Sequence, residues 1–132
     1  MKKDYNLLIG APFKDMGRGP NNFDCWGVVI YVRRMYGLYT PDYGVSANKA
    51  DAICFEYNLR KADWIEINKK EKPMVGDVIL FNRTDGGLHF GVVVEDGYFA
   101  QANKIFGFHL CKVANPILFN QIQSFYRFED NE

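Results

Sequence analysis

The stretch NNFDCWGVVIYV, residues 21–32, decides the fold. It places Cys25 between an acid, Asp24, and Trp26, and then runs into β-branched residues. Such a run has strand propensity, and in a strand Cys25 would be a small buried hydrophobe. In the alternative, Asp24 caps a helix by accepting an N–H from its first turn, and Cys25 then lies at the helix N-terminus.

Two features of the following residues favour the helix. Val28, Val32 and Met35 recur at helical spacing, and Tyr36-Gly37 supplies a stop. At a helix N-terminus the positive end of the dipole favours the thiolate, which is the nucleophilic form of cysteine. From these residues alone, both a structural thiol and a nucleophile stay open.

Length and composition restrict the class of protein. With 132 residues, 48% of them hydrophobic, the chain fits one domain with one core, residues 1–132. Sixteen basic and 16 acidic residues give no net charge, which argues against nucleic acid and anionic membrane as partners. No run approaches the ~20 apolar residues of a membrane span. The start lacks a signal peptide, so we expect the protein to be made in the cytoplasm and carried elsewhere by another route.

The pattern of elements predicts an α+β fold. Residues 9–22 are rich in Gly, Pro and Asn and should form a surface loop. Residues 46–60 have the spacing of a short amphipathic helix. Four later stretches have the pattern of strands. The first contains a run of consecutive apolar residues, which suits a strand that is covered on both faces. The four stretches are 72–82, 88–103 as a hairpin, 107–113 and 124–128. Helices followed by strands indicate an antiparallel sheet.

A cysteine nucleophile needs a base, and the chain has two histidines. His89 opens the first hairpin strand, 64 residues after Cys25 (89 − 25). A third polar group must hold the base in the right tautomer, and Gln101 or Asn103 on the second hairpin strand can do so. His109 lacks such a partner nearby in sequence, and we expect a satisfied or exposed strand histidine there.

The parity of the hairpin tests this assignment. Side chains alternate between faces along a strand, so a two-residue turn would put Gln101 on the opposite face from His89. A three-residue loop over residues 95–97 places Asn103 opposite His89 and Gln101 diagonally on the same face, ~7–8 Å away at Cα. The triad therefore requires an odd loop, with Gly97 at positive φ.

A metal site has weak support. His109 and Cys111 alternate onto one strand face, and Cys25 or Cys54 could join them, but no C-x-x-C or H-x-x-x-H pair is present. Cys54 and Cys111 are better interpreted as core residues. We expect no metal and no cofactor.

Four elements in this order resemble the NlpC-type cell-wall peptidases, a papain-like group of cysteine peptidases. The resemblance runs from about Ile9 to Phe128. Its matching elements are Asp24-Cys25-Trp26-Gly27, Gly76-Asp77, His89-Phe90-Gly91 and the polar residue Gln101. The resemblance implies a papain-like α+β fold in which N-terminal helices pack on an antiparallel sheet and the nucleophile heads a helix.

The resemblance also implies roles. Cys25 would be the nucleophile, His89 the base, and Gln101 the third residue, with Asn103 as the alternative. Asp24, Trp26 and Phe13 would line the oxyanion and substrate region. The substrate implied is a peptide bond of the peptidoglycan stem, D-glutamyl to the diamino acid in many members.

The motif GRGPNNFDCWG, residues 17–27, resembles most closely the branch encoded by phages and prophages, where Trp follows the cysteine. That branch implies a tail-associated enzyme, with phage tail proteins as partners, delivered to the cell wall by the virion. One departure is Phe13, which stands where many members have a Tyr that lines the site. It keeps two alternatives open: a structural tail component with little or no activity, and an acyltransferase on the same Cys/His site.

Overall fold

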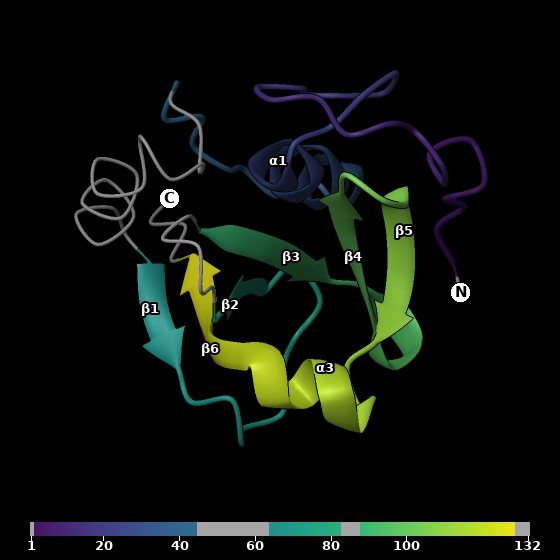
Figure 1. Cartoon of the computed structure of the whole chain (residues 1–132). Coiled ribbons are helices and arrows are strands. Elements are labelled where there is room, and N and C mark those ends of the chain that lie inside the picture. The colour runs from purple at the N-terminus through teal and green to yellow at the C-terminus, as the bar shows by residue number, and fades with distance from the viewer. Residues whose placement is uncertain (1, 45–63, 83–87, 129–132) are drawn as a thin grey trace.

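The computed structural model describes residues 2–44, 64–82 and 88–128. One helix, α1, packs against a six-stranded antiparallel sheet in the order β1-β6-β2-β3-β4-β5, and the sheet curls strongly (Figure 1). The elements are α1 (Cys25–Met35), β1 (Trp64–Ile67), β2 (Val78–Phe81), β3 (His89–Val93), the 3-10 turn η1 (Glu95–Gly97), β4 (Tyr98–Asn103), β5 (Gly107–Lys112), α3 (Pro116–Gln121) and β6 (Ile122–Phe128). The predicted α+β class with an antiparallel sheet is confirmed. The helix expected over residues 46–60, which includes Cys54, lies outside the described residues.

The stretch at residues 21–32 is helical from Cys25 onward. Asp24 is the N-cap, and its carboxylate accepts the Gly27 N–H at 2.6 Å. At the other end Gly37 adopts φ 75° and its N–H bonds the Arg34 carbonyl, so the expected stop is present. Strand propensity is overridden because the capped helix buries its valines in the core.

α1 lies against β3 and β4 and forms the larger core (Figure 1). Val28 and Val32 of the helix pack with Phe90 and Val92 of β3, and all four are fully buried. By the period of two, Phe90 and Val92 face the helix while His89 and Val93 face the other way. Because α1 holds Phe90 and Val92, the direction of the His89 side chain on the opposite face of β3 is fixed as well.

The far face of the sheet carries a second core. Ile79 and Phe81 of β2 pack there with Val93, Phe99 and Phe125, and Phe119 of α3 lies against them. All four residues of β2 are buried, two toward each core. The prediction of a doubly covered strand from its run of apolar residues is thereby confirmed.

Buried charge joins the sheet to its flanks. Arg127 of β6 donates two hydrogen bonds to Asp77, at 2.9 and 2.8 Å, and the Met74 N–H donates a third. Arg33 of α1 is 4% exposed and donates to the Gly76 carbonyl at 2.6 Å. The Gly-Asp pair at positions 76–77 thus anchors both the helix and β6 at the start of β2.

The β3–β4 hairpin has the predicted odd loop. The Val94 N–H donates to the Tyr98 carbonyl at 2.9 Å, and Val92 pairs with Ala100, so residues 95–97 form the loop. Gly97 has φ 78°, as expected. Asp96 is also left-handed, at φ 60°, so the loop differs from a type I turn followed by one left-handed glycine.

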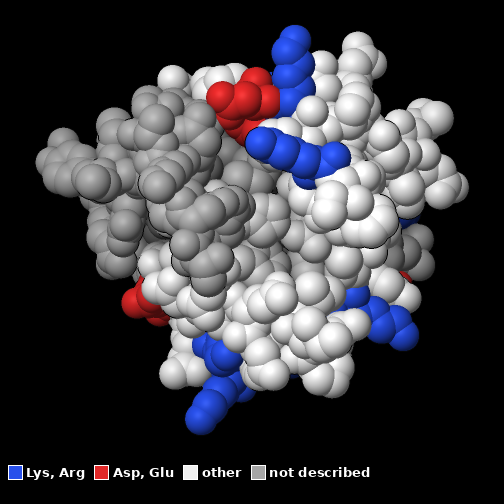
Figure 2. All heavy atoms as spheres, in the orientation of Figure 1, with Lys and Arg blue, Asp and Glu red and all other residues white. Residues whose placement is uncertain are grey.

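Figure 2 shows Lys and Arg side chains in small separate groups on one face, with acidic side chains beside those at the top. This agrees with the balanced composition and gives that face no basic stripe of the kind that binds nucleic acid. Within residues 2–44, 64–82 and 88–128, no helix is both long and apolar enough to cross a bilayer.

Gly27→Ala should destabilise the protein much more than Gly37→Ala. A Cβ at position 27 would lie 1.9 Å from the Gly17 carbonyl oxygen, whereas position 37 has open space and only the strain of φ 75°. We expect a loss of about 1–2 kcal/mol at position 37 from left-handed strain, and about 3 kcal/mol at position 27 from overpacking. Urea unfolding measures both, and equal losses would contradict the tight contact.

Candidate active site

His89 and Gln101 lie in direct contact. Nε2 of the imidazole is 2.7 Å from Oε1 of the glutamine, across the β3–β4 pair. Gln101 is 7% exposed, so this hydrogen bond is largely shielded from water. The contact follows from the three-residue loop, because only an odd loop brings the two side chains to one face. The arrangement expected from parity is present.

The partner of Nε2 determines the tautomer of His89. A carboxamide oxygen only accepts, so the Nε2 that faces it must carry the proton. In the neutral ring Nδ1 is then the nitrogen that can take up a proton. Gln101 is uncharged, so it orients the ring without the charge stabilisation that a carboxylate would give an imidazolium.

Cys25 lies where the first residue of α1 meets the start of β3. Its side chain is buried, 5% exposed, and Sγ is 3.9 Å from the carbonyl oxygen of Leu88, the residue that precedes His89. The fold therefore brings the thiol, the imidazole and the carboxamide to one end of the β3–β4 pair. Cys25 thus lies against the residue that precedes His89, and a cysteine nucleophile requires such a histidine as its base.

Asp24 has a different role from the expected one in the oxyanion region. It is 3% exposed, and besides the Gly27 N–H it accepts the Met16 N–H at 3.0 Å and Nη1 of Arg18 at 2.7 Å. Arg18 also binds Asp42, and this hydrogen bond lowers the pKa of the Asp42 carboxyl. A carboxylate with three donors fixes the start of the helix, and its negative charge could not stabilise an oxyanion.

Trp26 was expected to line the substrate region, and the structure corrects this. Its side chain is 0% exposed, packs edge-on against Phe90 and Trp64, and donates Nε1–H to the Pro41 carbonyl at 2.9 Å. Because it follows Cys25 on the helix, it turns into the core and anchors α1. Phe13 is half-buried, forms a bridge with Phe23 and packs against the same core, so its position as a lining residue remains a proposal.

The structure favours Gln101 over Asn103 as the partner of His89. The Asn103 side-chain oxygen accepts the N–H groups of Ile105 and Phe106, at 3.0 and 2.7 Å, and so closes the β4–β5 turn. The turn chemistry of the sequence NKIFG could have indicated this, since Asn side chains commonly bond the backbone two residues on.

His109 and Cys111 have a connection that the sequence analysis missed. His109 contacts the Gly107 carbonyl through Nδ1 at 2.8 Å, as a satisfied strand histidine would. It also hydrogen-bonds Cys111, whose Sγ accepts from Nε2 of Gln101 at 3.5 Å. Cys111 is half-buried at the margin of the second core, so the expectation of a plain core residue is only partly right. The alternation of His109 and Cys111 was the available signal.

These contacts shift two pKa values. Burial raises the pKa of the Cys111 thiol, but hydrogen bonds from His109 and Gln101 and the charge on His109 outweigh it, and the net pKa lies below the ordinary value. The hydrogen bond to Cys111 raises the pKa of His109, against the opposing effect of burial. The hydrogen bond between the two side chains therefore contributes to both shifts, in opposite directions.

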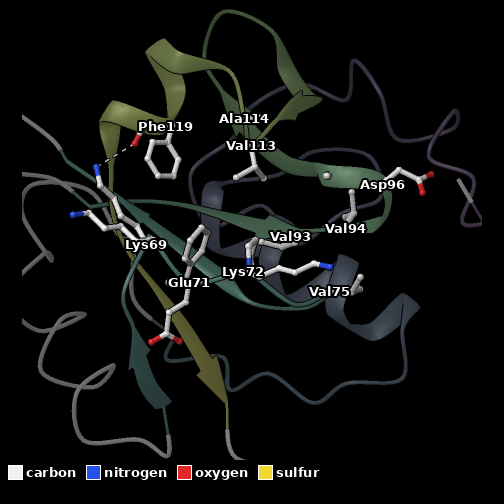
Figure 3. Close-up of a pocket in the computed structure, with 14 residues that line it drawn as sticks. Lys69, Glu71, Lys72, Val75, Val93, Val94, Asp96, Val113, Ala114 and Phe119 are labelled. Atoms are coloured by element: carbon white, nitrogen blue, oxygen red, sulfur yellow. Dashed lines mark hydrogen bonds between the residues drawn. The ribbon is translucent and has the colours of Figure 1, made fainter.

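Two other features could have formed a site near Cys25: a metal cluster and the pocket in Figure 3. Among the described residues, no three His, Cys, Asp or Glu side chains are grouped to hold a metal ion. The pocket, of about 500 Å³, lies between the β1–β2 connection, the β3–β4 loop and α3 (Figure 3). Lys69, Val93, Val113 and Phe119 line it, and none of the thiol, imidazole and carboxamide groups described above does.

Comparison with known families identifies the family of the chain. Residues 10–124 match the NlpC/P60 family. The chain belongs to the NlpC/P60 family. The NlpC/P60 family is generally made up of cysteine peptidases that act on the peptides of bacterial cell-wall peptidoglycan. The sequence-based resemblance to NlpC-type peptidases is confirmed at this level. No curated protein matches the chain at a significant level.

Two solved structures show the same fold. One, described as similar to a lipoprotein of the NLP/P60 family from Staphylococcus aureus, has a TM-score of 0.60 and 22% identity. The other, an NlpC/P60 family protein from Bacillus cereus, has a TM-score of 0.61 and 19% identity. The matches cover 94% and 93% of this chain but only 38% and 37% of those proteins. The papain-like α+β expectation agrees with both.

His109→Ala should raise the pH at which Cys111 becomes reactive. Removal of the His109 ring withdraws the hydrogen bond and the charge that lower the pKa of Cys111, so that pKa should rise toward its ordinary value. The measurement is the rate of iodoacetamide labelling against pH, read by mass spectrometry on the tryptic peptide of residues 105–112. An unchanged labelling midpoint in the variant would contradict the pairing of His109 with Cys111.

Proposed function

We propose that this domain hydrolyses a peptide bond in the stem peptide of peptidoglycan, with Cys25 as nucleophile, His89 as base and Gln101 as the residue that orients the base. One observation carries the proposal most: the 2.7 Å contact of His89 Nε2 with Gln101 Oε1. Cys25, at the N-terminus of α1, has its Sγ 3.9 Å from the carbonyl oxygen of Leu88, the residue before His89. Membership of the NlpC/P60 family supports the substrate class.

The reaction follows from the positions of these groups. Nδ1 of His89 takes the Cys25 proton, and the thiolate attacks the scissile carbonyl carbon. The developing oxyanion is stabilised by the backbone N–H of Cys25 and by the positive end of α1. The protonated Nδ1 then gives its proton to the leaving amine, which departs from a thioester on Cys25. In the second half, His89 Nδ1 takes a proton from water as the water oxygen attacks the thioester carbonyl carbon. The C–S bond breaks, the carboxylic acid product leaves, and the imidazolium returns its proton to the Cys25 thiolate.

Two finer expectations rest on the sequence resemblance alone. The bond between D-glutamate and the diamino acid is the one that the NlpC-type motifs imply. Action from a phage or prophage tail is implied by the GRGPNNFDCWG motif at residues 17–27. Mass spectrometry of purified virions or tails from a host that encodes the chain tests the second, and its absence from tails that assemble normally would contradict it.

Cys25→Ala and His89→Ala should each abolish turnover, and the double variant should lose little more, because the two residues act as one unit. The assay is incubation with defined stem peptides followed by product analysis by mass spectrometry. His109→Ala removes the other imidazole, and we expect it to keep turnover within about 10-fold of the wild type, far above the His89→Ala variant.

The same assay separates the proposal from its alternatives. Hydrolysed fragments support the peptidase, whereas products that join the acyl fragment to an added amine would indicate an acyltransferase. Folded protein that yields neither product from peptides or intact peptidoglycan would contradict both enzymatic functions and leave a structural role. If His109→Ala were inactive and His89→Ala active, the base would be His109.

A further inference from the structure

A chain of polar side chains continues from Gln101 on the side away from His89. In the β4–β5 pair Gln101 lies opposite His109, and Phe99 opposite Cys111, so Gln101, His109 and Cys111 share one face of the sheet. Nε2 of Gln101 donates to Cys111 Sγ at 3.5 Å, and Cys111 in turn hydrogen-bonds His109. The order of contacts is His89, Gln101, Cys111, His109.

The donors and acceptors along this chain select one arrangement. The Gly107 carbonyl can only accept, so Nδ1 of His109 must donate to it. Nε2 of the neutral ring is then an acceptor, and it takes the hydrogen bond, or the proton, of Cys111. Sγ is left to act as an acceptor, and the group that donates to it is the NH₂ of Gln101.

A glutamine carboxamide can turn by 180° about its last bond at little intrinsic cost, so its partners decide its orientation. With NH₂ toward Cys111, Oε1 faces His89 and requires a proton on Nε2. With the opposite orientation, NH₂ would face Nε2 and the proton of the neutral ring would move to Nδ1. An Nδ1 that already carries its proton cannot accept one from a thiol.

We propose that Cys111 is a positioning residue, which holds the Gln101 carboxamide in the orientation that keeps His89 in the tautomer able to act as base. The inference rests on the proposed function of Cys25 and His89. Cys111 does not touch the reacting atoms, and its effect passes through Gln101. The burial of Gln101 fits this role. Its side chain is almost fully enclosed, so water cannot readily replace Cys111 as the acceptor of the Gln101 NH₂ group.

Kinetics with a matched pair of variants tests the proposal. Cys111→Ala removes the acceptor, and we expect kcat to fall about 10-fold with KM within about twofold, a part of the roughly 10²–10⁴-fold that a general acid–base group contributes. Cys111→Ser keeps an acceptor of similar size and should retain kcat within about threefold. Equal kcat in Cys111→Ala and the wild type, or equal losses in the Ala and Ser variants, would overturn the proposal.

A spectroscopic measurement tests it without any substrate, so it stands apart from the proposed function. In ¹⁵N spectra of the ring nitrogens above the imidazole pKa, wild-type His89 should be protonated at Nε2, and Cys111→Ala should show a mixture of tautomers. His109→Ala frees the thiol proton to bond Gln101 Oε1, so it should shift the tautomer in the same direction. If Cys111→Ala does not fold, the His109→Ala variant tests the same prediction. The wild-type tautomer in every folded variant of this set would contradict the role of Cys111.

Discussion

The hydrogen bond between His89 and Gln101 is the contact on which the site depends, and the parity of one hairpin makes it possible. Three residues in the β3–β4 loop bring both side chains to the same face. A two-residue loop would place them on opposite faces, since side chains alternate along a strand. The loop needs two left-handed residues, Asp96 and Gly97, and one of them is glycine, which adopts that conformation without strain.

The position of the thiol depends on a second constraint, at the start of α1. The Asp24 carboxylate accepts hydrogen bonds from Gly27, Met16 and Arg18. One buried carboxylate therefore joins the loop before the helix to the first turn of the helix. A capping side chain of this kind contributes about 1 kcal/mol to the stability of a helix. The close contact of Gly27 with Gly17 adds a steric condition that only glycine meets. Asp24, Trp26 and Gly27 therefore surround the nucleophile for structural reasons, and the Cys25 thiol lies against the Leu88 carbonyl, next to the start of β3.

Much of this arrangement could be predicted from sequence because it follows from local rules. An acid before the cysteine, valines at helical spacing and Gly37 after Tyr36 together predict the helix and both its ends. The Asp-Gly turn and the alternation of side chains predict that Gln101, rather than a residue of the other face, can reach His89. The family motifs added the order of the groups along the chain, and the family match spans residues 10–124.

The rest depends on contacts between segments that are distant in sequence. Trp26 reads as an aromatic next to the nucleophile, and only the meeting of α1 with β3 and β1 shows that it is enclosed by Phe90 and Trp64. Cys111 reads as a small hydrophobe, and only the β4–β5 register places it against Gln101.

A covalent intermediate on Cys25 is the most direct test of the catalytic role of this site. The measurement is rapid acid quenching of the protein mixed with a stem peptide, followed by peptide mapping by mass spectrometry. We expect the acyl fragment as a thioester on the tryptic peptide of residues 19–33, which contains Cys25, and its loss in Cys25→Ala. The same fragment on Cys111, or steady turnover by Cys25→Ala, would contradict the assignment of the nucleophile.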